Sequence, residues 1–391
     1  MERRCVFNRQ ETLSSADRGS SCESPGGRRQ TQRGRTPGSY ERRRFVTRPA
    51  NRLLSLVRDR TGAAQLLVLK DGETLIELDH HCDKRSLFWS FSASKPYIAI
   101  LVYILAEQGL LGIDAPVASY WPEFAKNGKG GVTIRNVLQH RSGFASAAGT
   151  NRDALAMLSW RASIRQIERA RLHWPTGTKP AYQILAFGFI LGEVVQRVTG
   201  RPVRDVLRDE LFEPLGARDT ALGVTGEAYD RSVRIHAASA RDALGAYALS
   251  WRAVRSAVVP SAGVSVTARD HALFYSMLLR GGVSSSGQRI VSFESIEDAR
   301  TLSAHDEIDL FAKNPIAWAN GFQLGGPSGN PLPPLGRLNN PRAFGHNGSN
   351  ICVGWADPDR KVVAVYLTNV LAKDNQKHIT DVSDAIVEIS G

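Results

Sequence analysis

The chain has few cysteines, no long apolar segment and no secretion signal. Its 391 residues include four cysteines, which are too scattered for a disulfide framework and form no C-x-x-C pair of the kind that binds zinc. This usage is typical of reduced thiols in a cytoplasmic protein. The longest apolar run, 97–106, is about half of what a bilayer requires, and no apolar signal core precedes it. We therefore expect no membrane span and a cytoplasmic location.

Several common enzyme motifs are also missing. The sequence contains no G-x-S-x-G, no H-E-x-x-H, no P-loop and no G-x-G-x-x-G. The usual sequence support for α/β-hydrolase, zinc-protease, nucleotide and Rossmann redox chemistry is therefore absent. The polar cluster at 79–83 contains two histidines and a cysteine, but adjacent ligands at a strand end rarely converge on one ion. We expect neither a metal nor an organic cofactor.

Positive charge is concentrated near the start of the chain. The net charge is +12, and the first 50 residues hold 12 Arg and no Lys against five acidic residues. No DNA- or RNA-binding motif accompanies this charge, so we expect no nucleic-acid partner. Residues 1–44 are rich in Arg, Ser, Gly and Gln, and we expect them to be disordered, or to result from a mis-called start, ahead of one folded domain at 45–391.

Apolar spacing predicts strands at both ends of the folded domain and helices between them. Asp71-Gly72 separates two strand-like runs and is a strong hairpin signal. The middle, 121–255, is helix-rich, and it interrupts α/β parts at 45–120 and 256–391. The helices are expected near 49–57, 93–109, 132–139, 151–170, 185–199, 202–211, 267–280 and 378–389, and the late strands at 316–325, 350–356 and 362–369.

The only S-x-x-K in the chain is Ser92-Ala93-Ser94-Lys95, at the start of the apolar helix. Residues three apart on a helix are neighbours, so the two side chains share a face. A helix N-terminus stabilises an alkoxide on Ser92 and disfavours the charged form of Lys95, which favours its use as a base. The motif alone is weak, because a lysine at a helix end can equally be a surface residue with its charge in water.

Five blocks in order strengthen the motif: LFWSFSASKP, VTIRNVLQHRSGF, WPTGTKPAYQILAFGFILGEVVQRVTG, VPSAGVSVTARDHALFY and AFGHNGSNICVGWADPDRK. Together they resemble the serine β-lactamase-related hydrolases, which include class C β-lactamases, penicillin-binding proteins, esterases of the same fold and D-aminopeptidases. The resemblance implies an α/β (α+β) fold of β-lactamase/transpeptidase type. Its antiparallel sheet is built from both chain ends and flanked by helices, with a helix-rich inserted subdomain.

The resemblance also assigns a catalytic set. Ser92 matches the acylated nucleophile, Lys95 its base, and Tyr182 the tyrosine of the Y-x-N element, acting as a phenolate or a hydrogen-bonded phenol. The alternative for Tyr182 is an ordinary packed aromatic.

A second matching element follows late in the chain. His346-Asn347-Gly348 matches the K-T-G or H-x-G strand that lines the site, and the N–H groups of Ser92 and Ser349 match the oxyanion hole. The alternative for His346 is a histidine at a surface strand edge.

Two departures from the β-lactamase pattern bear on the substrate. Ile184 stands where the Asn of Y-x-N is expected, and His346 replaces the Lys of K-T-G. A neutral imidazole cannot replace a permanent cation that holds a β-lactam carboxylate. Both changes favour a neutral, apolar acyl substrate and the esterase branch.

The predicted function is therefore a serine hydrolase that cleaves carboxylic esters (class EC 3.1.1) through an acyl-enzyme on Ser92, or transfers the acyl group to an alcohol. The alternatives are a D-aminopeptidase or amidase, a weak β-lactamase and a catalytically inactive scaffold. The partner is a small-molecule ester or amide, and the oligomeric state stays open.

Three further segments are expected to serve architecture: a turn at 140–143, a site wall at 260–263 and a core position for Trp355.

Overall fold

The computed structural model describes residues 48–303, 307–327 and 329–391, which belong to one compact unit, Val46–Gly391. The expected disordered segment at 1–44 lies outside the described residues.

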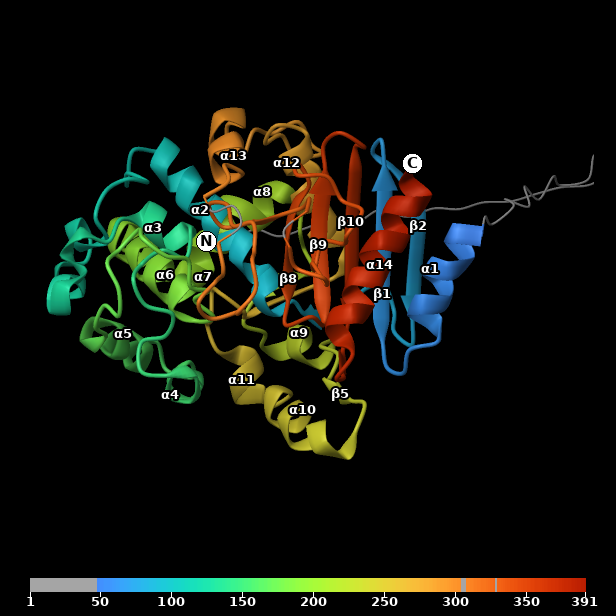
Figure 1. Ribbon diagram of the computed structural model, residues 1–391, viewed down its shortest axis with the longest axis horizontal. Helices are drawn as coiled ribbons and strands as arrows, with labels where there is room; N and C mark the ends of the chain where they lie inside the picture. The colour runs from blue at the N-terminus through green and yellow to red at the C-terminus, as the bar shows by residue number, and fades with distance from the viewer. Residues whose placement is uncertain (1–47, 304–306, 328) are drawn as a thin grey trace, which may run out of the picture. The chain divides into compact units, whose positions relative to one another are not determined.

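A six-stranded antiparallel sheet forms the centre of this unit (Figure 1). The strand order is β2-β1-β10-β9-β8-β7, so β1, near the start of the domain, pairs directly with β10, near its end. The strands are β1 (Ala64–Lys70), β2 (Glu73–His80), β7 (Gln323–Leu324), β8 (Phe344–Gly348), β9 (Cys352–Asp357) and β10 (Val362–Thr368). The prediction of one sheet built from both chain ends is confirmed.

The two predicted turns of this sheet form, but one predicted strand does not. Asp71 and Gly72 have φ of 51° and 83°, which is the backbone of a type I′ turn between β1 and β2. The turn after Asp357 joins β9 to β10. The strand expected at 316–325 shrinks to Gln323–Leu324, because the backbone reverses at Gly321, whose φ is 99°.

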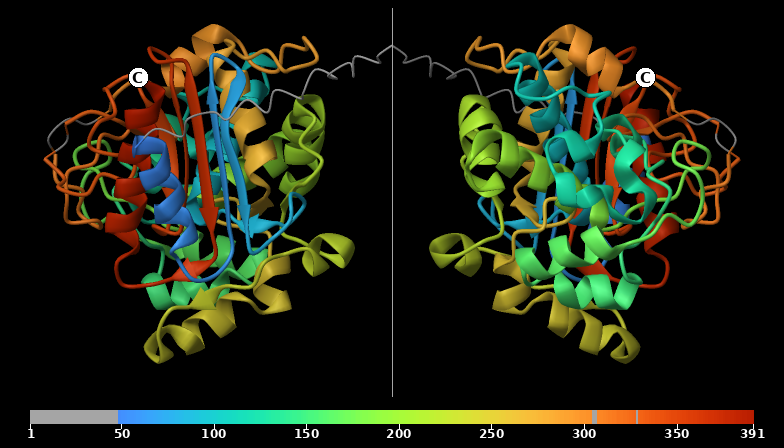
Figure 2. Two further views of the ribbon diagram at one scale, coloured as in Figure 1. Left: turned by 90° about the vertical axis from the view of Figure 1, so that its right-hand side faces the viewer. Right: turned by 90° about the vertical axis from the view of Figure 1, so that its left-hand side faces the viewer.

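Helices cover both faces of the sheet. Figure 2, which shows the sheet from its edge, has α1 (Arg48–Arg58) and α14 (Asn375–Ser390) on one side and α12 (Ala268–Leu279) on the other. Strand β10 serves both layers, because its side chains alternate in direction. Ala364 and Tyr366 pack toward α14, whereas Val363 and Val365 belong to the larger core on the opposite face.

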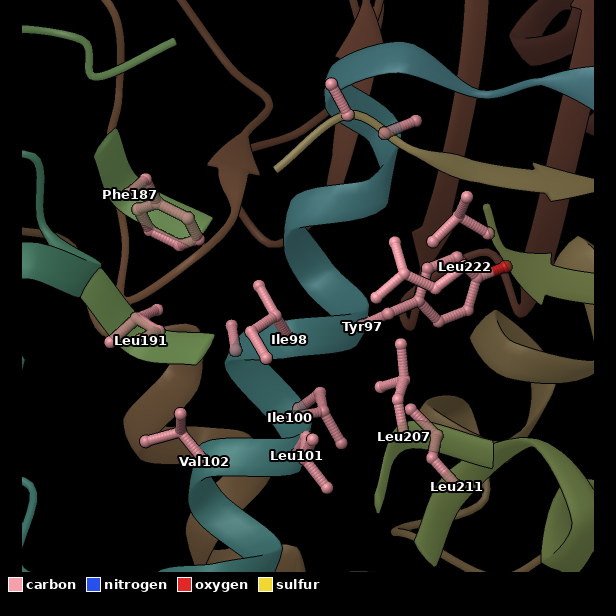
Figure 3. Close-up of a cluster of buried hydrophobic side chains, with 14 of the residues drawn as sticks. Tyr97, Ile98, Ile100, Leu101, Val102, Phe187, Leu191, Leu207, Leu211 and Leu222 are labelled. Atoms are coloured by element: carbon pink, nitrogen blue, oxygen red, sulfur yellow. The ribbon is translucent and has the colours of Figure 1, made fainter. Parts of the chain in front are cut away.

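The helix α2 (Lys95–Glu107) runs through the larger core. It is apolar all round, as expected of a fully buried helix, and it packs against Phe187 and Leu191 on one side and Leu207 and Leu211 on another (Figure 3). We predicted that it begins at residue 93. Instead a 3₁₀ turn, Phe91–Ser94, precedes it, and Pro96 occupies the first turn of α2, where a missing N–H is tolerated.

The middle of the chain is helical, as predicted, but one predicted helix divides and another changes its helical type. The segment 151–170 divides at Ser159, whose side chain caps the second helix by accepting from the N–H of Ala162. The helix predicted at 202–211 is α-helical to Leu207 and continues as a π-helix over Arg208–Phe212. The helices here are α3 (Ile134–Leu138), α4 (Thr150–Ala156), α5 (Trp160–Arg169), α6 (Ala186–Thr199), α7 (Val203–Leu207), α8 (Glu213–Leu215), α9 (Gly226–Asp230), α10 (Ala243–Leu249) and α11 (Arg252–Ser256), with α13 (Phe293–Ala299) later.

Two small sheets complete the fold. The first pairs β3 (Phe88–Trp89) and β4 (Thr220–Leu222) with β6 (Val264–Val266), and it supports the chain just before Ser92. The second pairs β5 (His236–Ala237) with β11 (Val370–Leu371) in parallel.

Candidate active site

The turn that carries Ser92 begins with a strained residue. Phe91 has φ of 46°, in the left-handed region that bulky side chains avoid. Its ring is buried and stacks on Trp89 with centroids 4.3 Å apart, and this packing holds the strained backbone in place. The backbone therefore changes direction immediately before Ser92, between β3 and the 3₁₀ turn.

Two neighbouring serines fasten this turn to the small sheet. The hydroxyls of Ser90 and Ser94 lie 2.9 Å apart. Ser90 donates to the carbonyl of Val264 at 2.9 Å, and Ser94 accepts from the N–H of Val264 at 3.1 Å. Sequence reasoning missed both serines, because nothing in the chain signals that β6 lies beside the turn.

The Lys95 side chain is completely buried and reaches the hydroxyl groups of the predicted site. Its Nζ lies 3.4 Å from the Ser92 Oγ, 2.9 Å from the Tyr182 Oη and 2.9 Å from the carbonyl oxygen of Ile184. Burial lowers the pKa of the Lys95 ammonium well below its usual range. The sequence pattern attributes this effect to the helix N-terminus, whereas in the structure the cause is the loss of water around the amine.

Tyr182 is held behind Lys95 by a buried aromatic cluster. Its ring stacks on Trp318 with centroids 5.2 Å apart and planes 5° apart, and it meets the His140 ring edge-on. The His140 Nδ1 accepts the N–H of Gln183, which fixes the backbone beside Tyr182. Burial raises the pKa of the Tyr182 phenol well above its usual range, although a hydrogen bond with Ser92 opposes the shift. Of the two predicted forms, the structure therefore favours the neutral phenol.

The N–H groups predicted to form the oxyanion hole come from the 3₁₀ turn and from the end of β8. Ser349 follows Gly348 directly and has φ of 50°, so the chain turns sharply there. Within the described residues, no hydrogen bond occupies the N–H of Ser92 or of Ser349. Two such free donors beside the serine hydroxyl can stabilise an oxyanion.

The predicted substrate-binding residues on β8 divide into two groups. Asn347 lines a cavity beside Ser92, whereas His346 is 1% exposed and lines neither of the two cavities described below. Burial lowers the pKa of His346 to about 3, with a smaller effect from Lys95, so its imidazole is neutral at pH 7. A Cβ on Gly348 would lie 2.0 Å from the Ser90 carbonyl oxygen. This glycine therefore lets β8 approach the nucleophile turn.

Two cavities meet at the nucleophile. Both are lined by Ser92, Ile184, Phe311 and Ser349. The first, the apolar chamber, has a volume of about 280 Å³ and is also lined by Trp89, Phe91, Ala145, Ser146, Thr150, Asp153, Ala154, Met157, Leu185, Leu249, Ala262, Ile351 and Leu371. The second, the polar chamber, has a volume of about 270 Å³ and is also lined by Tyr182, Ala312, Asn314, Ile316, Trp318, Gln323, Asn330, Pro334, Asn347, Asn350 and Gln376.

Comparisons with known proteins identify the family of this chain. The family model described as Beta-lactamase matches residues 46–386. The chain belongs to this Beta-lactamase family. It is 28% identical over 351 residues to "Esterase/beta-lactamase LipL" of Mycobacterium tuberculosis, across 80% of this chain and 78% of that protein. These relationships identify a hydrolase family whose members include esterases and penicillin-binding proteins.

Solved structures show the same fold. A penicillin-binding protein homologue from Caulobacter crescentus superposes with a TM-score of 0.75 at 23% identity, covering 88% of this chain and 98% of that one. A family VIII carboxylesterase superposes with a TM-score of 0.73 at 24% identity, covering 86% and 97%. The predicted β-lactamase/transpeptidase-like fold is thereby confirmed.

The three segments of this Beta-lactamase family member that were expected to serve architecture lie where the sequence predicted them. The backbone turns at His140 and Gly143, with φ of 58° and 88°. The carbonyl of Ser261 lies 3.4 Å from the Lys95 Nζ, so the 260–263 segment forms a wall of the site. Trp355 is fully buried in the core under α14.

Among the described residues, no helix has the length and apolarity to cross a membrane, and no group of three or more His, Cys, Asp or Glu could hold a metal ion.

Proposed function

We propose that the protein is a serine esterase that forms an acyl-enzyme on Ser92. The observation that carries the proposal is the buried amine of Lys95, which has hydroxyl groups of Ser92 and Tyr182 as neighbours and forms no ion pair with a carboxylate of the described residues. An uncharged amine in that position can accept the serine proton as a general base.

The proposed reaction has two stages. The Ser92 oxygen attacks the ester carbonyl while its proton passes to the amine of Lys95, and the oxyanion accepts hydrogen bonds from the N–H groups of Ser92 and Ser349. When the intermediate collapses, the bond to the alcohol breaks, and the leaving oxygen receives the proton from Lys95 through the Tyr182 hydroxyl. Water then attacks the acyl-serine with the same base, which releases the carboxylic acid and restores Ser92. An alcohol in place of water gives acyl transfer.

The two chambers support a neutral ester with an apolar acyl group. The apolar chamber is lined mainly by aliphatic and aromatic side chains such as Met157, Leu249 and Leu371, which suit an acyl chain. The polar chamber presents amides, among them Asn314, Asn347 and Gln376. These amides can bind a hydroxylated leaving group or an incoming alcohol.

The charge of the chambers argues against a carboxylate-bearing substrate. Among the described residues that line them, none is Lys, Arg or His, and the single charged side chain is Asp153. Its carboxylate already accepts from the N–H groups of Ala147 and Ala148, both at 2.9 Å. A β-lactam carboxylate therefore has no cation to pair with there, which favours the ester over the β-lactamase alternative.

Intact-mass spectrometry with a series of p-nitrophenyl esters tests the proposal. We expect one acyl adduct per chain, located on Ser92 by peptide mapping, and no adduct in Ser92→Ala. Ser94→Ala is the matched control, because it removes the other hydroxyl of the same turn: the loss of its contacts to Ser90 and Val264 should slow acylation, but the adduct on Ser92 should still form. Equal labelling of Ser92→Ala, or no ester turnover by the wild type, would reject the proposal. Nitrocefin turnover comparable with ester turnover would favour the β-lactamase alternative.

A further inference from the structure

A third, smaller cavity lies away from Ser92 and has an unusual lining. It has a volume of about 190 Å³ and is bordered by residues of α9 and α11, by the residue that follows α10 and by the loop before β5. The lining side chains are Tyr229, Asp230, Ser232, Arg234, Ser250 and Arg255. All six are polar, and two of them are arginines.

Arg255 is a buried cation without a negatively charged partner. It is 3% exposed, and no carboxylate pairs with it among the described residues. Burial lowers its pKa to about 10, so the guanidinium still carries its charge at neutral pH. Burying an unpaired charge is costly, so a bound anion would relieve a cost that the fold otherwise carries.

The hydrogen bonds of Arg255 leave donors unused. One terminal nitrogen donates to the carbonyl of Val233 at 3.1 Å, and the other donates to the hydroxyl of Ser265 at 3.1 Å. A guanidinium has five N–H groups, and the buried Nε–H has no partner in the described part of the chain. Both acceptors are neutral, so an oxyanion is the missing complement for this donor set.

The serine hydroxyl groups that line the cavity already donate to backbone carbonyls, so the arginines are the donors that remain for a ligand. The Ser232 hydroxyl donates to the carbonyl of Ala228, and the Ser250 hydroxyl donates to that of Ala246. The exposed Arg234 side chain has no hydrogen bond or ion pair within the described residues. Asp230 is the one acid in the lining, and it forms no ion pair with either arginine there.

We propose that this cavity is a binding site for a small oxyanion, a phosphate or a carboxylate, held between the guanidinium groups of Arg255 and Arg234. Arg255 also lies over the ring of Trp89, 5.3 Å from its centroid, and Trp89 lines the apolar chamber. The anion site and the acyl site therefore share a wall. The inference does not depend on the reaction proposed for Ser92.

Titration of the full chain with sodium phosphate, sodium acetate and sodium chloride at matched pH and ionic strength tests this site. We expect a saturable rise in melting temperature with phosphate or acetate beyond that with chloride, and calorimetry should give one site per chain. The oxyanion that binds more tightly identifies the ligand class. No saturable difference from chloride would overturn the proposal.

Variants connect the binding to the two arginines. Arg234→Gln, an exposed position, and Arg255→Lys, which keeps the charge but loses the planar fork, should each weaken binding about tenfold, or about 1.4 kcal/mol. Arg241→Gln removes the same charge from an exposed position that does not line the cavity and should leave the dissociation constant unchanged. Equal affinity in all three variants would also overturn the proposal, and Arg234→Gln provides that test even if Arg255→Lys does not fold.

Discussion

In the described part of the chain two lysines are completely buried, and their hydrogen-bond partners differ. Lys129 directs its ammonium at three carbonyl oxygens, those of Lys126, Glu168 and Ala170, at 2.5–3.1 Å. These acceptors use all three donors of an ammonium. Lys95 divides its contacts between two hydroxyl groups, those of Tyr182 and Ser92 at 2.9 and 3.4 Å, and two carbonyls, those of Ile184 and Ser261 at 2.9 and 3.4 Å.

The two lysines also lie at opposite ends of helices. Two of the carbonyls that bind Lys129 belong to the C-terminal end of α5, where the helix dipole favours a cation. Lys95 is the first residue of α2, where the dipole opposes one. Burial lowers the pKa of Lys129 only to about 8, whereas that of Lys95 falls well below its usual range. A buried lysine with three carbonyl acceptors thus holds loops together as a cation, and one beside two hydroxyls is suited to move a proton.

Removing the Lys95 amine should produce the largest effect. Lys95→Met keeps the length of the side chain but cannot accept the Ser92 proton, so kcat/KM for esters should fall about 10³-fold or more. Lys95 forms no ion pair within the described residues, so the variant also removes a buried amine whose charged form has no negatively charged partner. We therefore expect the free energy of unfolding to rise by about 0.5–2 kcal/mol, less the loss of the hydrogen bonds to Tyr182 and Ile184. Ester kinetics and urea unfolding measure the two quantities. A variant that keeps a tenth of the wild-type activity would show that Lys95 is not the base.

The same substitution at Lys129 should have the reverse outcome. Lys129→Met leaves three buried carbonyls without donors, which should lower the free energy of unfolding by at least about 2 kcal/mol. Activity per folded molecule should stay within about twofold, because no contact joins Lys129 to Ser92. Lys126→Met is the control, since its exposed side chain does not take part and should change stability by less than about 0.5 kcal/mol. A stable but inactive Lys129→Met would refute the contrast between the two lysines.

The sequence predicted a role for Lys95 but gave no sign of the buried contacts of Lys129, and the reason is physical. Lys95 belongs to a local S-x-x-K pattern in which spacing along one turn places the side chains together. Lys129 is bound by carbonyls about forty residues away, at the end of α5, and no spacing rule reports a contact of that kind.

The same distinction between local and distant contacts explains which parts of the fold could be predicted from the sequence. Hairpin and helix patterns gave the sheet and the positions of most helices. The break at Ser159 and the loss of the strand at 316–325 depend on a capping hydrogen bond and on a turn at Gly321. In the site, Ser94 and His140 lie within the quoted blocks, but their hydrogen bonds to Val264 and Gln183 join segments far apart in the sequence, so the blocks did not predict these contacts.

The pH dependence of activity should distinguish the two lysines as well. The base must be uncharged, so kcat/KM should rise with pH and level off above the pKa of Lys95, at a midpoint well below 10.5. In Lys129→Met the midpoint should not move, although the loss of Lys129 changes stability. Initial rates on p-nitrophenyl acetate, corrected for hydrolysis without enzyme, give the profile. A rate that increases as the pH falls would contradict the assignment of an uncharged amine.

The smallest expected effect concerns the residue that binds Lys95 through its backbone. Ile184 offers only its carbonyl to the amine, and its side chain lines both chambers. In Ile184→Asn the carbonyl remains, so the pH midpoint should be unchanged, while a polar group at the junction of the chambers should lower kcat/KM for apolar acyl esters about tenfold. If the midpoint shifts together with the rate, the side chain at 184, and not only its carbonyl, helps to set the pKa of Lys95.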